Sequence, residues 1–461
     1  MRGLRSTLAL LVVAVALGSY AYFIEADRPP VSTADELVPV FEFESDDITT
    51  VTVTAENGDR TRVNKADARW RLVEPFEGNV DVTAVVGLTS SLATLEMQRI
   101  VAEPEDELAL ETFGLAEPRI SLDVETSTGV EATLLIGART PTGGDVYATL
   151  AGSNRVFLVS GYLDDTFNQT TFDLRDKRIL DFTNDEVAGL AITGDEVAVQ
   201  LRKSDNRWTL TIPIEAHADT GTSDGLVGRL STDQIASVEA ETADDLTPYG
   251  LATPRLQVEV QLTGSTATLS VGSQAGPGRI YARDAARDLV FTIDETLVAD
   301  LTRDAVAYRR RDLFGFRPFN AVSLGVERDG DQWSFEKTEA ADGTSSWRQL
   351  SPDATDVDEA AMEDLLAQLS NLRADEFVDS RDNTGLEAPV ASIRVSFTDR
   401  EDNVTEERVV VGRPDGDGTD TNVVFAVSGD EPGAARLNAE AWNDAIEALE
   451  TLSDAPGTTP S

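Results

Sequence analysis

The sequence predicts an α+β protein made of three tandem repeats of a mostly antiparallel β unit, with one main helix in each, after an N-terminal transmembrane helix. Three observations predict this: motifs that recur in one order along the 461 residues, strand-like alternation of apolar and polar residues around them, and an apolar run near the N-terminus. A length prior of about 150 residues per domain also allows roughly three domains.

The apolar run Leu8–Ile24 follows two arginines and precedes acidic residues and prolines. Its length is at the lower limit for crossing a bilayer, and the aromatic residues at its end favour an uncleaved anchor, although Ser19–Ala21 offers a cleavage-type site. The arginines orient the N-terminus toward the cytoplasm. We therefore expect a cytoplasmic stub and anchor in residues 1–28, a spacer in 29–38, and a periplasmic body on a single-pass protein of the inner membrane.

The first recurring motif is a tryptophan followed five residues later by a proline, on a predicted strand. Its copies are Trp70–Pro75, Trp208–Pro213 and Trp347–Pro352. The tryptophans could be exposed ligand platforms, but their common strand register favours packing in the core.

The second motif, Gly-Leu-x-x-Pro, also occurs three times without an insertion, at Gly114–Pro118, Gly250–Pro254 and Gly385–Pro389. After each copy come an alternating strand and a hairpin that ends in an aliphatic residue and a glycine. These pairs are Ile136-Gly137, Val271-Gly272 and Val411-Gly412. The order of marks therefore indicates one repeated unit.

A third motif closes the first two copies, where an aromatic-alanine strand precedes a Val-Phe strand. It is found at Tyr147-Ala148 with Val156-Phe157 and at Tyr281-Ala282 with Val290-Phe291. In the third copy we expect both strands to be compressed into Val423–Ala426, so that the terminal unit could be truncated.

A helical stretch lies between the first two motifs of each copy. It is clearest over 359–372, where apolar residues recur at helical spacing and Asp356 or Asp358 could cap the helix. We expect three strands, this helix and about four further strands in each unit. The predicted units are 39–182, 183–316 and 317–454, followed by a disordered tail, 455–461.

Two basic segments, 174–182 and 308–316, join the predicted units of an otherwise acidic chain. Their side chains could pair with nearby acids and brace successive units, or could dock a partner protein. The candidate docking residues are Arg175, Lys177, Arg178, Arg309, Arg310 and Arg311.

The composition disfavours several classes of chemistry. A net charge of −45 disfavours nucleic-acid binding, and the absence of cysteine excludes disulfides, thiolate nucleophiles and zinc–thiolate sites. The single histidine, His217, is expected in a loop as a solvated residue, which disfavours a catalytic triad or a histidine-rich metal site. Asp415–Asp420 is similar to a calcium loop but lacks the glycine at its sixth position and the glutamate at its twelfth. We therefore expect no catalytic, cofactor-binding or metal-binding residues.

The ordered series of motifs, with the Leu-Arg-Asp-Lys segment, resembles a bacterial family known only as a domain of unknown function, whose members are typically anchored in the envelope at the N-terminus. The resemblance covers nearly the whole chain after the anchor. Members are often encoded beside subunits of gliding-motility-type ABC transporters, so the resemblance implies an accessory role outside the cytoplasm. We expect a non-enzymatic scaffold that acts with such a transport system; the alternatives are a module that binds envelope polysaccharide or peptide and, less favoured, a hydrolase that uses acidic residues.

Overall fold

The computed structural model describes residues 38–103, 110–153, 155–339, 345–399, 402–413 and 423–454. The predicted anchor, the spacer up to residue 37, the loop Asp415–Asp420 and the tail 455–461 lie outside the described residues. Within the described ranges, no helix is long and apolar enough to cross a membrane. The chain divides into two compact units, one ending at Lys177 and one beginning at Arg178.

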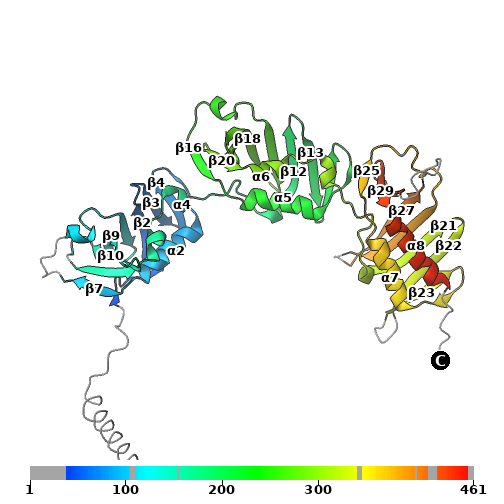
Figure 1. The fold of residues 1–461 in the computed structure, drawn as a ribbon, viewed down its shortest axis with the longest axis horizontal. Helices are drawn as coiled ribbons and strands as arrows, with labels where there is room; N and C mark the ends of the chain where they lie inside the picture. The colour runs from blue at the N-terminus through cyan, green and yellow to red at the C-terminus, as the bar shows by residue number, and fades with distance from the viewer. Residues whose placement is uncertain are drawn as a thin grey trace, which may run out of the picture. The chain divides into compact units, whose positions relative to one another are not determined.

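In the first unit, strands with alternating buried residues form one nine-stranded antiparallel sheet (Figure 1). In sheet order the strands are β5 (Gly78–Asn79), β4 (Arg69–Glu74), β3 (Arg60–Ala66), β2 (Ile48–Thr54), β8 (Ile120–Thr126), β9 (Glu131–Arg139), β10 (Asp145–Leu150), β11 (Val156–Ser160) and β7 (Arg99–Ala102). A separate pair joins β1 (Val38–Pro39) to β6 (Glu96–Met97). The helices are α2 (Val82–Ala93), α3 (Leu163–Phe167) and α4 (Thr171–Leu174), with 3-10 turns η2 (Ser45–Asp47) and η3 (Leu110–Phe113).

The second unit contains two further nine-stranded antiparallel sheets. The second sheet runs β15 (Ala216–His217), β14 (Arg207–Ile212), β13 (Ala198–Ser204), β12 (Val187–Gly194), β17 (Leu256–Leu262), β18 (Thr266–Gly276), β19 (Arg279–Asp284), β20 (Val290–Asp294) and β16 (Ser237–Ala240). The third runs β24 (Thr355–Asp356), β23 (Ser345–Ser351), β22 (Asp331–Glu339), β21 (Ala321–Arg328), β26 (Ala391–Thr398), β27 (Val404–Gly412), β28 (Val423–Ser428), β29 (Ala434–Asn438) and β25 (Glu376–Val378).

Helices accompany both sheets of the second unit. They are α5 (Thr220–Thr232), α6 (Glu295–Leu301), α7 (Glu359–Ser370) and α8 (Ala439–Asp454), with 3-10 turns η4 (Asn184–Glu186), η5 (Thr247–Tyr249), η6 (Ala305–Tyr308) and η7 (Pro318–Asn320). Figure 1 shows α7 and α8 side by side on the third sheet. The α+β class and the mostly antiparallel sheets are therefore confirmed, and the three sheets have the same strand order.

The two glycine motifs pack against each other in every sheet. The glycine of Gly-Leu-x-x-Pro has a left-handed φ of +68° at Gly114, +68° at Gly250 and +72° at Gly385. This turn lies directly on the aliphatic-glycine pair, because a Cβ at Gly272 would stand 2.1 Å from the Tyr249 carbonyl oxygen. The residue after the motif's proline then donates its N–H to the aliphatic residue of that pair, over 2.9 to 3.0 Å in the three sheets. The glycine of Gly-Leu-x-x-Pro and the glycine of the aliphatic-glycine pair therefore belong to one packing contact between the turn and the hairpin.

The three motif tryptophans are core residues, as their register predicts. Their relative exposures are 9% for Trp70, 1% for Trp208 and 4% for Trp347. The Trp208 indole also donates to the Asp224 carboxylate over 2.8 Å. The peptide bond before the motif's proline is cis in all three copies.

An aspartate caps the main helix of each sheet. The side chains of Asp81, Asp219 and Asp358 accept backbone N–H groups from the first turns of α2, α5 and α7. Of the two caps considered for the third helix, Asp358 is therefore the one used, and the helix ends at Ser370. Each cap also fixes where the preceding edge strand must turn into the helix.

The expectation of a compressed third copy is wrong. β28 and β29 are separate strands, and Ala426 pairs with Ala435 as Ala148 pairs with Phe157 in the first sheet. The Val-Phe motif is replaced by Ala434-Ala435, which removed the signal from the sequence. Ala435 shares its core with Trp442 of α8, so a bulky residue is supplied from the helix instead.

Candidate partner-docking site

The basic segments that join the sheets form backbone hydrogen bonds with the sheet edges. We call residues 174–182 the first connector and residues 308–316 the second connector. In the first unit, Asp81 donates its N–H to the Leu174 carbonyl over 2.9 Å, and Asp176 donates to the Asn79 carbonyl over 3.0 Å. The start of the first connector therefore extends the sheet beyond its edge strand β5.

The second connector does the same at the edge of the second sheet. Asp219 donates to the Tyr308 carbonyl over 2.7 Å, and Arg310 donates to the His217 carbonyl over 2.9 Å. The predicted loop position of His217 is therefore wrong, because this residue belongs to β15 and pairs with Thr209. Partial burial and then the positive charge of Arg310 lower the pKa of His217 below its ordinary value.

The second half of each connector pairs with the segment that follows the main helix of the next sheet. Ile179 donates its N–H to the Asp233 carbonyl over 3.2 Å, and Leu313 donates to the Leu372 carbonyl over 3.0 Å. In the first sheet, β1 and the residue that follows it lie at the equivalent position. That residue, Val40, donates its N–H to the Leu95 carbonyl over 2.8 Å. Each sheet therefore receives one incoming strand at an equivalent position.

Arg309 is the most buried of the six candidate docking residues, with a side chain that is only 3% exposed. Its guanidinium lies 3.8 Å from the centre of the Phe377 ring and donates to Glu431 over 3.0 Å and to the Pro432 carbonyl over 3.3 Å. Its Nε atom is buried and has no hydrogen-bond partner among the described residues. This arginine therefore lies in the protein interior.

The neighbouring arginines of the second connector also have partners within the second unit. Arg310 pairs with Glu407 at 3.2 Å, and Glu407 also accepts the Gly315 N–H over 2.6 Å. Arg311 is exposed and donates to the Asp375 carbonyl over 3.0 Å. The structure thus brings Arg309 and Arg310 together with two glutamates that lie far along the chain.

The first connector holds the other three candidate residues. Arg175 is buried, with its guanidinium 4.8 Å from the centre of the Phe76 ring. Lys177 donates to the Asp173 carbonyl over 2.9 Å and lies 3.7 Å from Asp81. In the second unit, Arg178 pairs with Asp181 at 2.7 Å.

The contacts of all six side chains therefore favour the bracing alternative. Docking by these six residues stays a prediction.

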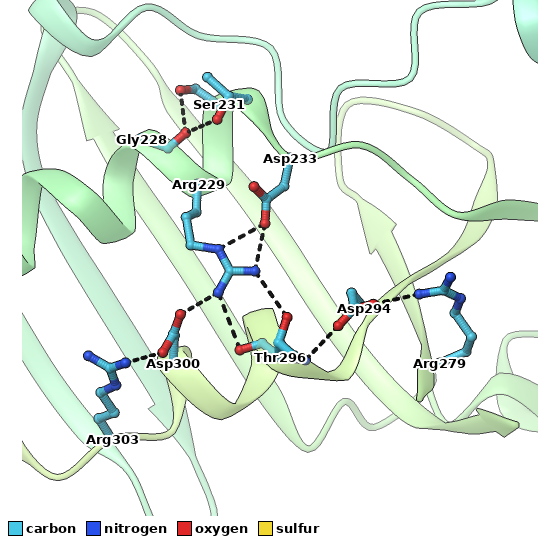
Figure 2. Close-up of polar contacts among 10 residues, drawn as sticks. Gly228, Arg229, Ser231, Asp233, Arg279, Asp294, Thr296, Asp300 and Arg303 are labelled. Carbon is cyan, nitrogen blue, oxygen red and sulfur yellow. Dashed lines mark hydrogen bonds and ion pairs between the residues drawn. The ribbon is translucent and has the colours of Figure 1, made fainter. Parts of the chain in front are cut away.

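A polar cluster specific to the second sheet clamps α5 to α6 (Figure 2). Arg229 donates through Nε to Asp233 over 2.9 Å and also pairs with Asp300, which in turn pairs with Arg303. Burial opposes the charge on Arg229, but the hydrogen bonds that Arg229 donates to Asp233 and Asp300 outweigh it and raise its pKa above the ordinary value. Because protein acids and Thr296 take the donors of Arg229, the cluster serves as a structural clamp.

Asp294, near the start of α6, extends this polar region in Figure 2. It accepts the Thr296 N–H over 2.9 Å and pairs with Arg279 at 2.7 Å. The hydrogen bond from the Thr296 backbone is the main reason why the pKa of Asp294 lies below its ordinary value. A capped and paired carboxylate of this kind holds the helix terminus and is poorly suited to proton transfer at neutral pH.

Besides a small pocket of about 20 Å³ at Arg309, two larger cavities lie in the described part of the second unit. One of about 280 Å³ lies beside the Arg229 cluster, where burial raises the pKa of Tyr308 to about 12. A larger one of about 890 Å³ is bordered by acids and lies at the start of α8, with Asp375, Glu376, Glu440 and Asp444 among its lining residues. In the described part of the chain, no group of three or more histidine, aspartate or glutamate side chains could hold a metal ion.

Sequence reasoning missed the acceptors of the connectors. Glu407 and Glu431 lie on strand β27 and in a turn, 97 and 122 residues from their arginines, and no local pattern relates such positions. The edges were also missed because β5, β15 and β24 are two residues long. The available signal in the sequence was the cap aspartate of each main helix. Asp81 and Asp219 directly follow the residues that form a bridge with a connector, and Asp358 has the corresponding position in the third sheet.

A family model described as a domain of unknown function, DUF4340, matches the chain twice, over residues 70–220 and 208–389. Each match begins at a motif tryptophan, and the first extends across the connector to the start of α5 in the next sheet. No curated protein and no solved structure matches the chain. Because the two matches together cover residues 70–389, more than half of the sequence, the chain belongs to the DUF4340 family.

Proposed function

We propose that this protein is a non-enzymatic scaffold, held at the inner membrane by the run Leu8–Ile24, whose sheets bind a protein component of an ABC-type transport system outside the cytoplasm. The observation that carries the proposal is the outer face of the sheets. On one face of the second sheet, Leu190, Ile192 and Val258 are fully buried. On the other face, Ala191, Gln257 and Glu259 stay accessible, as in sheets with one solvated side.

Polar pairs cover this outer face in each sheet. Thr133 donates to Asp123 over 2.7 Å in the first sheet, and Gln257 donates to Glu259 over 2.9 Å in the second. In the third sheet, Arg394 pairs with Glu406 at 3.3 Å, with more than half of each side chain exposed. Pairs of this kind contribute little to stability and are free to exchange partners, which suits a recognition surface.

The test is affinity purification of the full-length chain from detergent-solubilised membranes, followed by identification of the proteins retained. We expect ABC-transporter subunits to be retained by the wild-type chain and to be lost when each outer face carries one reversed charge, Glu125→Lys, Glu259→Lys and Glu406→Lys. The matched control, Glu295→Lys, Glu363→Lys and Glu447→Lys, makes the same change in charge on exposed helix positions. Retention of no transporter subunit, or equal retention by both triple variants, would refute the proposal.

The 890 Å³ cavity favours a second candidate function, a module that binds an envelope polysaccharide or peptide. A ligand at one hundred times its dissociation constant adds about 2.7 kcal/mol to the free energy of unfolding. Thermal shift with cell-wall glycan fragments measures this gain. No shift with any fragment, or a shift that persists in the Arg436→Ala variant of the cavity lining, would exclude this cavity as the binding site.

A further inference from the structure

The edge strand beside the main helix is closed by a connector in two of the three sheets. Val80 forms a β-bridge with Arg175 at the edge of the first sheet, and Ala218 forms the equivalent bridge with Arg309 in the second. Both edge residues are buried as a result, with exposures of 6% and 5%. The connector thus supplies the final strand of each of these sheets.

At the equivalent edge of the third sheet, no connector pairs with the edge strand among the described residues. Val357, which corresponds to Val80 and Ala218, is only half-buried. Among the residues that the structure describes, the Asp358 N–H has no backbone acceptor, whereas Asp81 and Asp219 donate to a connector. The Asp356 carbonyl accepts the hydroxyl of its neighbour Thr355 over 3.4 Å, whereas the equivalent Asn79 and His217 carbonyls accept connector N–H groups. Backbone N–H and carbonyl groups that bond to a connector in the first two sheets therefore have no such partner among the described residues of the third.

We propose that the edge Thr355–Asp358, here called the acceptor edge, binds an extended segment of a partner protein as an additional antiparallel strand. The inference rests on the proposed scaffold function and names the place where the partner docks. The two connectors define the expected segment: an aliphatic or aromatic residue opposite Asp358, followed by an arginine opposite Val357. Main-chain hydrogen bonds supply affinity in this mode, and alternate side chains supply specificity.

Both internal examples show what such a segment needs. The residue that precedes the arginine is fully buried in each case, as Leu174 in the first sheet and Tyr308 in the second, so an apolar side chain anchors the strand. The second connector continues with Arg310 and Arg311. An apolar anchor followed by basic residues is therefore the pattern that this fold accepts.

The charge of the acceptor edge is complementary to that pattern. Asp353, Asp356, Asp358 and Glu359 lie within or beside it and are all exposed. Arg348 lies 4.0 Å from Asp356, and both side chains are more than half exposed. A basic partner strand is therefore attracted to this edge, and an acidic strand, including most of this chain, is repelled.

The test uses full-length single-cysteine variants and a synthetic peptide of residues 305–313, in which cysteine replaces Arg310 and is supplied as its disulfide with thionitrobenzoate. The thiolate of the chain attacks the peptide sulfur and releases thionitrobenzoate, so the rate of mixed-disulfide formation is read directly. The natural chain has no cysteine, so each disulfide reports one position. In the register of the second sheet, peptide position 310 lies opposite Asp356. Asn79→Cys and His217→Cys are matched controls, because they put the thiol at the equivalent residue of the two closed edges.

We expect the Asp356→Cys chain to form the mixed disulfide at least about tenfold faster than either control, because a closed edge must first release its connector. A peptide of the same composition in scrambled order should lose this advantage. For the peptide with its natural Arg310 and a fluorophore at its N-terminus, measured by fluorescence anisotropy, Asp356→Lys should weaken binding about threefold to tenfold, and Glu440→Lys should leave it unchanged.

Equal rates at the three cysteines, or equal rates with the scrambled peptide, would overturn the inference. Disulfide-linked dimers of the Asp356→Cys chain without peptide would instead identify a second copy as the occupant and would also overturn it. If transporter subunits are still retained by an Asp356→Lys chain while the peptide result fails, only the acceptor edge is wrong. If no subunit is retained by the wild-type chain although the peptide binds, the proposed function fails and the edge stands.

Discussion

Substitution of Gly272 by alanine tests the contact between the two glycine motifs. The added Cβ would lie 2.1 Å from the Tyr249 carbonyl oxygen and 3.1 Å from the Leu251 side chain. Neither neighbour can easily move. The turn that carries them is fixed by the Leu251 N–H, which donates to Leu246 over 3.1 Å, and by the Arg255 N–H, which donates to Val271 over 3.0 Å.

The cost can be worked out from these contacts. Overpacking a well-packed site costs about 1–3 kcal/mol, and weakening one of the two backbone hydrogen bonds adds about 1 kcal/mol. Loss of glycine's freedom in the unfolded chain returns about 0.4–1 kcal/mol. We therefore expect Gly272→Ala to lower the free energy of unfolding by about 1–4 kcal/mol. At about 2–4 °C per kcal/mol for a domain of roughly 150–250 residues, this corresponds to a Tm lower by roughly 2–14 °C.

The matched control is Gly276→Ala, in the same strand β18, where an added Cβ meets no atom within 4 Å. It should change stability by less than about 0.5 kcal/mol. Calorimetry measures both variants, and hydrogen exchange of peptides from residues 256–276 assigns the loss to the second sheet. Equal Tm values for the two variants would refute the contact as a determinant of stability.

Two further predictions concern the second connector. Arg309→Ala should destabilise the second unit by about 2–3 kcal/mol in urea unfolding, because it leaves Glu431 without its buried partner. The control Arg311→Ala, at an exposed position, should lower the free energy of unfolding by less than about 0.5 kcal/mol. Equal losses in the two variants would contradict the bracing role. Because the folded-state pKa of His217 is lowered by partial burial and by Arg310, the unfolded chain takes up the proton first, so stability should fall as the pH drops below the ordinary histidine value of about 6.5. His217→Gln should lower the difference in Tm between pH 7.5 and pH 5.5, and an unchanged difference would contradict this.

The motifs revealed the fold because each one marks a local requirement. A left-handed glycine, a buried tryptophan and a cap aspartate are needed wherever the unit occurs, and all three recur in sequence at fixed places. The sequence did not predict β28 and β29 as separate strands, because two alanines stand in place of the Val-Phe pair and Trp442 of α8 fills the core there. Sequence alone therefore identifies a position when the backbone dictates the residue, and misses it when a distant side chain can supply the same volume.

The connectors could be predicted as basic segments but not as strands. A pairing of two or three residues has no periodicity to detect, and Arg309 finds Glu431 only through the fold. Their charges suggested docking or bracing, and in the described residues these side chains contact nearby acids, carbonyl groups and aromatic rings. A basic segment in an acidic chain thus indicates charge pairing without telling whether the acid lies in the same molecule.

The arrangement of connectors also explains where acidic residues are needed on the sheet edges. Exposed edges invite pairing with any extended chain, and natural sheets blunt them with charge or cover them. The first and second sheets cover theirs with a connector, whereas the acceptor edge carries Asp356 and Asp358, which disfavour pairing with the acidic strands of another copy. The same two carboxylates admit a basic strand, so one pair of residues would both prevent aggregation and select the partner.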